Sequence, residues 1–141
     1  MLKGISTKLS PDLLKVIAEM GHGDELVIGD CNFPAASLGK RCIRADGLGG
    51  TEVLDAVLSL FPLDAFVEAP VTLMDVIPGT VECEPPIWNE YKEIVERWEP
   101  GTKIEWIDRF EFYERTKKAY ATVATAERAL YACIIIKKGV L

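Results

Sequence analysis

The sequence predicts an α/β domain in which a mixed β-sheet carries helices on its faces. Segments with apolar residues at three- and four-residue spacing, typical of helices, alternate with short branched apolar runs, typical of buried strands. The strand-like runs gather toward the end of the chain, which favours a mixed sheet. With 141 residues and no recognisable linker, repeat or low-complexity tract, the chain is expected to form one domain over residues 1–141.

The helices are predicted from apolar spacing together with start and stop signals. Ser10 and Pro11 supply a capping hydroxyl and a proline at the first helical position. Pro62 ends the second helix. Trp88 and Tyr91 belong to an aromatic stripe in the third helix, and such stripes usually pack in a core. The predicted helices cover residues 11–20, 51–60, 87–98 and 109–115.

The strands are predicted from short runs rich in branched and aromatic residues. The last two runs are separated by residues 126–130, and a five-residue connection suits a hairpin loop. Residues 32–40 contain proline, glycine and small residues, and are expected to form a loop. The predicted strands cover residues 26–28, 41–44, 71–77, 103–107, 120–125 and 131–136.

Composition and charge exclude several classes of partner. The net charge is −6 without a basic run, so neither nucleic acid nor a membrane surface is an expected partner. No segment approaches the ~20 apolar residues of a membrane helix, and the N-terminus lacks the apolar core of a signal peptide. The cysteines lie far apart in the sequence. This spacing favours their interpretation as small buried residues of a protein in a reducing compartment. We therefore expect a cytoplasmic protein. Its hydrophobic content of 49% is slightly high for a monomer, which favours a partner subunit.

The stretch from Met20 to Pro34 holds the strongest candidates for chemistry. His22, the only histidine, lies in a glycine-flanked turn before a predicted strand, and Asp30 follows that strand. Histidine is the side chain best suited to proton transfer near neutral pH, whereas an acid after a strand lies where α/β folds bind ligands. Extended backbone would separate the two by roughly 20 Å. They can share a site only if the backbone turns back or a second subunit supplies one of them.

Other residues are weaker candidates on their own. Arg109 and Tyr113 lie four residues apart and would share one face of a helix. Tyr131 begins the last predicted strand, where a core role is the simpler interpretation. The chain has no dinucleotide fingerprint, P-loop, serine elbow or metal-ligand spacing. The remaining hypothesis is a site with no metal and no cofactor, suited to proton transfer on a small polar molecule.

Several separate blocks of the chain carry a family resemblance. They are Glu19-Met20-Gly21-His22-Gly23-Asp24-Glu25, Asp30-x-Asn32-Phe33-Pro34, Ile43-Arg44-Ala45-Asp46-Gly47-Leu48, Pro62-Leu63-Asp64-x-Phe66-Val67-Glu68-x-Pro70, Arg109-Phe110-x-Phe112-Tyr113-Glu114-Arg115 and the ending Tyr131…Lys137-Lys138-Gly139-Val140. In this order they resemble the RbsD/FucU family of sugar mutarotases, and they are closer to its L-fucose mutarotase branch than to its D-ribose pyranase branch. The resemblance covers nearly the whole chain.

The resemblance implies a three-layer α/β/α fold and a cofactor-independent isomerase that interconverts the α and β anomers of a fucose-like monosaccharide. It also implies a homo-oligomer, a ring or a decamer, in which a neighbouring subunit contributes to each site. His22 matches the family's proton donor, and Asp30 would orient it, grip a hydroxyl or act as base. The positions that match sugar-binding residues are Asp30, Asp64, Arg109, Tyr113 and Tyr131.

Two positions depart from the family pattern. Cys133 stands where the family usually has asparagine, and a thiol donates and accepts hydrogen bonds poorly. Ala126 stands where the family has glycine between Thr125 and Glu127. Cys133 is still expected at a substrate-binding position. Its presence leaves open an alternative function, a non-catalytic sugar-binding or regulatory protein of carbohydrate metabolism.

Overall fold

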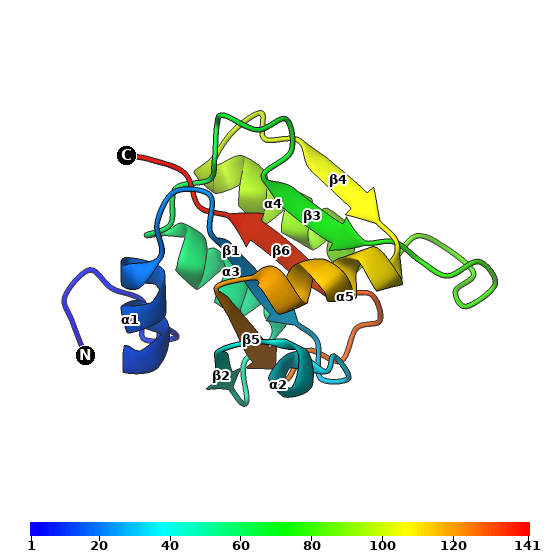
Figure 1. The fold of residues 1–141 in the computed structure, drawn as a ribbon, viewed down its shortest axis with the longest axis horizontal. Coiled ribbons are helices and arrows are strands. Elements are labelled where there is room, and N and C mark those ends of the chain that lie inside the picture. The colour runs from blue at the N-terminus through cyan, green and yellow to red at the C-terminus, as the bar shows by residue number, and fades with distance from the viewer.

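Six strands form one mixed sheet with helices on both faces in the computed structural model, which describes residues 1–141 (Figure 1). The strand order is β2-β5-β1-β6-β3-β4. Strand β6 is antiparallel to both of its neighbours, and every other adjacent pair is parallel. The strands are β1 (Glu25–Gly29), β2 (Cys42–Ala45), β3 (Val71–Met74), β4 (Ile104–Ile107), β5 (Ala121–Thr125) and β6 (Ile134–Lys137).

The helices largely match the positions that their apolar spacing predicts. The Ser10 hydroxyl accepts a hydrogen bond from the Leu13 amide at 3.1 Å, so the predicted cap is confirmed. One short helix, α2, lies inside the segment predicted as a loop; with four residues it is too short to show helical periodicity. The helices are α1 (Pro11–Glu19), α2 (Ala35–Leu38), α3 (Gly50–Leu58), α4 (Ile87–Trp98) and α5 (Arg109–Lys118).

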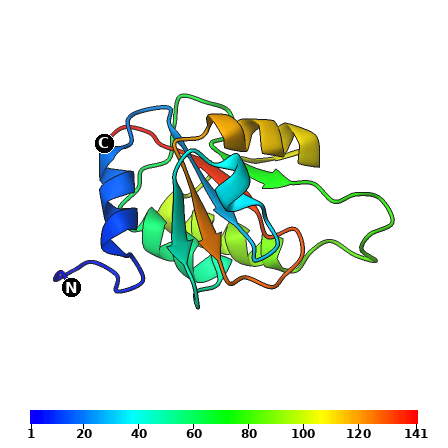
Figure 2. The same ribbon diagram turned by 60° about the horizontal axis from the view of Figure 1, so that its bottom comes forward.

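Helices cover both faces of the sheet (Figure 2). A hydrophobic core lies on each face, which confirms the three-layer α/β/α arrangement. Leu26 and Ile28 of β1 point into the larger core, where 26 buried residues pack the sheet against α1, α3 and α4. Val27 points to the opposite face, where Phe112 of α5 is fully buried. This alternation along β1 is the two-residue period of a strand that is buried on both faces.

The predicted hairpin between the last two strands is wrong, because β1 lies between β5 and β6. Strand β6 begins at Ile134 rather than at Tyr131, so the connection from Thr125 is longer than predicted and steps past β1. Both strands are almost entirely buried, and continuous apolar strands of this kind carry no alternation that would indicate their neighbours.

The strand directions determine which loops meet. Strands β1 to β5 all point one way, so their carboxyl ends share one edge of the sheet with the beginning of β6. Asp30 follows β1 and Arg109 follows β4 at this edge, while His22 precedes β1 at the opposite edge.

None of the helices has both the length and the apolar character that a membrane-spanning helix needs.

Candidate functional site

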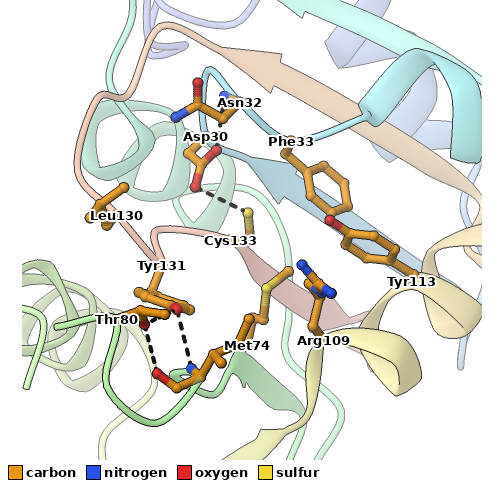
Figure 3. Close-up of a pocket in the computed structure, with 11 residues that line it drawn as sticks. Asp30, Asn32, Phe33, Met74, Thr80, Arg109, Tyr113, Leu130, Tyr131 and Cys133 are labelled. Carbon is orange, nitrogen blue, oxygen red and sulfur yellow. Dashed lines mark hydrogen bonds between the residues drawn. The ribbon is translucent and has the colours of Figure 1, made fainter.

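A cavity of about 270 Å³ opens at the carboxyl edge of the sheet (Figure 3). Its volume is near the lower end of the ~300–1,000 Å³ typical of small-molecule sites. The cavity brings together five residues that the sequence proposes for substrate binding: Asp30, Arg109, Tyr113, Tyr131 and Cys133. Its other lining residues are Asn32, Phe33, Met74, Ile77, Thr80 and Leu130.

Asp30 and Cys133 form a buried pair at one side of this pocket (Figure 3). The Cys133 thiol donates to Asp30 Oδ2 at 3.4 Å, and the Asn32 amide donates to Asp30 Oδ1 at 3.0 Å. Burial raises the pKa of Cys133 well above its usual value, and the nearby Asp30 carboxylate raises it further. Cys133 therefore remains a protonated thiol at neutral pH and acts as a donor that holds the Asp30 carboxylate.

Tyr131 lies at the pocket in a conformation that is rare for its residue type. Its φ is +57°, a left-handed value that side chains other than glycine seldom adopt. Its hydroxyl accepts a hydrogen bond from the Ile77 amide at 3.1 Å and forms another with the Thr80 hydroxyl. Strained backbone that the surroundings hold in place is common at functional sites.

Helix α5 places Arg109 and Tyr113 on one face, as the four-residue spacing predicts. The Asp108 carboxylate caps this helix by accepting hydrogen bonds from the Phe110 and Glu111 amides. The Tyr113 ring packs edge-on against Phe33 at a centroid distance of 5.7 Å. The pocket thus gains a guanidinium and a phenol opposite the Asp30 carboxylate.

His22 and Asp64 form a second cluster, at the other edge of the sheet. His22 Nε2 lies 3.1 Å from Asp64 Oδ1, which also accepts a hydrogen bond from the Phe66 amide at 3.0 Å. The Asp64 side chain is buried, whereas the imidazole is 47% exposed and has the Phe66 ring 5.5 Å away. The Phe66 amide, and then His22, lower the pKa of Asp64. An ionised Asp64 can therefore hold the orientation of the His22 ring through this contact.

This lowered pKa predicts a dependence of stability on pH. A carboxyl whose pKa is lower in the folded than in the unfolded state stabilises the fold above its unfolded value, near 3.8, and loses that effect as the pH falls through the folded value. The Asp64→Asn variant is therefore expected to lose less stability than the unmodified protein between pH 5 and about pH 3. Urea unfolding across this range measures it; identical losses in both proteins would contradict the assigned shift.

The proposed site residues therefore fall into two groups within one copy of the chain. The Asp30 pocket lies at the end of β1 and the His22 cluster at its beginning, and the strand alone spans roughly 13 Å. Within one copy, Asp64 rather than Asp30 orients His22. The first of the two arrangements considered for these residues, a backbone that turns back, is not what the structure shows.

Several residues beside these groups were not assigned a role from the sequence. Phe66 packs on His22, and Thr80 and Ile77 bind the Tyr131 hydroxyl. Phe66 lies in one of the family-like blocks, so that block offered a signal for it. Thr80 and Ile77 belong to an irregular loop after β3. The strand predicted over residues 71–77 ends at Met74, so its extension to Ile77 is wrong.

The fold and these clusters define a class: a three-layer α/β protein with a small polar pocket at one edge of its sheet and a histidine–aspartate pair at the other. Residues 3–141 match the model of a family described as the RbsD / FucU transport protein family. The chain belongs to this family.

Known members of the family are similar to this chain over almost their whole length. The fucose mutarotase of Homo sapiens is 51% identical over 99% of this chain and 94% of that protein. The crystal structure of the fucose mutarotase in complex with L-fucose from Streptococcus pneumoniae has a TM-score of 0.93 at 48% identity and covers 99% of both chains. Bacillus subtilis RbsD complexed with D-ribose is more distant, with a TM-score of 0.74 at 26% identity over 100% of this chain and 99% of that one.

Proposed function

We propose that this protein is a mutarotase that interconverts the α and β anomers of a fucose-like monosaccharide. The observation that carries this proposal is 48% identity, over 99% of both chains, to a fucose mutarotase whose structure contains L-fucose. The site geometry supports it, because carboxylate, guanidinium and phenol groups line a pocket of about 270 Å³. These groups suit the hydroxyls of a monosaccharide.

The chemistry needs only proton transfers. Ring opening requires one proton delivered to the ring oxygen and one removed from the anomeric hydroxyl, and a positioned acid and base typically contribute ~10²–10⁴-fold. In this proposal His22 moves the proton while Asp64 holds its ring, and Asp30 binds a sugar hydroxyl or serves as the base. Tyr113 or Tyr131 donates to a ring or anomeric oxygen. Closure on the opposite carbonyl face then gives the other anomer.

We further propose that each active site joins two copies of the chain. The His22 cluster of one copy would face the Asp30 pocket of the next, so that the two groups meet across a subunit interface. Exposed apolar side chains at both places support such a contact: Phe66 beside His22 is 75% exposed, and Phe110 beside Arg109 is 70% exposed. A contact between unlike surfaces of identical copies closes into a ring when the rotation between neighbouring copies divides a full turn, and such a ring is compatible with a homo-oligomer as large as a decamer.

The cysteines bear on both location and specificity. All four are unpaired, which favours a reducing compartment and hence the cytoplasm. Cys133 is 2% exposed and donates to Asp30, so it contributes to the sugar site mainly by fixing that carboxylate. The weak thiol in place of the usual asparagine keeps a non-catalytic sugar-binding or regulatory protein as the second candidate function.

Saturation-transfer NMR on anomeric protons distinguishes the two functions. A mutarotase transfers magnetisation between α- and β-fucose at catalytic protein concentration, with smaller rates for galactose and ribose. A protein that broadens the sugar lines without speeding exchange would refute the catalytic proposal and establish the binding one.

A further inference from the structure

The backbone of residues 131–133 carries two groups of the pocket. Tyr131 contributes the phenol that binds the Ile77 amide, and Cys133 contributes the thiol that donates to Asp30. The segment begins with the left-handed backbone of Tyr131, the one non-glycine residue with a positive φ. A conformation of this kind persists only where neighbouring groups hold it in place.

Helix α4 holds this segment by two successive carbonyl groups. Trp88 Nε1 donates to the Tyr131 carbonyl at 2.9 Å, and the Tyr91 hydroxyl donates to the Ala132 carbonyl at 2.8 Å. The two aromatic residues are three positions apart, so they lie on one face of the helix, and both are buried. One of these hydrogen bonds is buried and the other partly buried, and together they restrict rotation of the two peptides that meet at Ala132.

Helix α3 leaves room for the second of these hydrogen bonds. Gly50 lies against the Tyr91 phenol, and a Cβ atom at position 50 would overlap the Tyr91 hydroxyl. Without the hydroxyl, the Tyr91 ring would leave just enough room for such a Cβ, because the distance from the Cβ to the ring carbon that bears the hydroxyl is 3.3 Å. The Tyr91 hydroxyl can therefore occupy this place only because residue 50 has no side chain.

We propose that Trp88 and Tyr91 are positioning residues for the sugar site: they hold the Tyr131 and Ala132 carbonyls and thereby set the Tyr131 phenol and the Cys133 thiol in the pocket. This inference rests on the proposed function only for the measurement made with fucose. If the two aromatic residues were core packing alone, Tyr91→Phe would leave the pocket unchanged, because it keeps the ring and removes one oxygen.

The first measurement needs no sugar. The Ile77 amide donates to the Tyr131 hydroxyl, so its hydrogen-exchange rate reports whether that phenol stays in place. In Tyr91→Phe and in Gly50→Ala we expect this amide to exchange about two- to tenfold faster, the factor that corresponds to one hydrogen bond. Trp98→Phe is the matched control, because Trp98 lies on the same helix but donates to Asp55 at the surface.

The second measurement uses fucose. In Tyr91→Phe we expect the half-saturating fucose concentration to rise about two- to tenfold, with a smaller fall in the maximal exchange rate. The double variant Gly50→Ala/Tyr91→Phe should match Tyr91→Phe in both measurements, because removing the hydroxyl makes room for the new Cβ. Additive effects of the two substitutions would show that they act separately.

The outcomes separate this inference from the proposed function. If the Ile77 amide of Tyr91→Phe exchanges as in the unmodified protein and in Trp98→Phe, the positioning role is overturned. If the unmodified protein does not exchange anomers, the proposed function fails, and the Ile77 measurement still decides the positioning role. Should Tyr91→Phe fail to fold, Trp88→Phe removes the neighbouring hydrogen bond and is judged by the same amide.

Discussion

Replacing His22 with alanine is expected to slow anomer exchange by about 10²- to 10⁴-fold, because the variant loses the group that moves the proton in the proposed mechanism. The Asp64 carboxylate that orients the ring would remain, but an ionised aspartate with a lowered pKa is a poor acid. Saturation transfer between the anomeric protons of fucose, measured per mole of protein, gives the rate. Added imidazole should restore part of it.

The same variant should still fold. The His22 imidazole is 47% exposed and lies outside both hydrophobic cores, so urea unfolding is expected to change little. Asp24→Asn is a suitable control, because Asp24 lies in the same turn and its side chain accepts a hydrogen bond from the Gly21 backbone amide rather than contacting His22. Full exchange activity in His22→Ala would remove histidine from the mechanism.

Replacing Asp30 with asparagine is expected to slow exchange about 10²-fold. The new carboxamide keeps the size of the side chain, and its oxygen can still accept a hydrogen bond from the Asn32 backbone amide. It loses the negative charge that, in the proposed mechanism, binds a sugar hydroxyl or accepts its proton. It also replaces the acceptor of the Cys133 thiol. The rate and the half-saturating fucose concentration, measured by the same NMR experiment, separate a loss of chemistry from a loss of binding.

Asp46→Asn is the matched control for this variant, because Asp46 is also an aspartate in a loop after a strand but pairs with Arg44 at the surface. Its exchange rate should equal that of the unmodified protein. Equal rates in Asp30→Asn and Asp46→Asn would show that the Asp30 carboxylate has no part in the reaction.

Local features of this fold could be predicted from the sequence, and long-range ones could not. The Ser10 cap and the branched run in β1 are properties of neighbouring residues, so the first helix and strand were found. The place of β6 between β1 and β3 depends on pairing among distant segments. Apolar strands such as β5 and β6 do not specify those partners.

The candidate site shows the same division. The motifs pointed to His22 and Asp30, but not to the contact between His22 and Asp64, which are 42 residues apart. The left-handed backbone of Tyr131 has no signal in the sequence, because tyrosine gives no indication of a positive φ. Trp88 and Tyr91 were predicted as core residues; they are buried, and their polar atoms also bind the backbone beside the pocket.

The central claim, an active site shared between two copies, is tested most directly by mixing two inactive variants. His22→Ala lacks one half of each site and Asp30→Asn the other, so mixed oligomers should contain some sites with both halves intact. When equal amounts of the two variants are unfolded and refolded together, about a quarter of the sites would combine two intact halves. We predict recovery of about a quarter of the unmodified anomer-exchange rate; mixed oligomers that stay inactive would contradict a shared site.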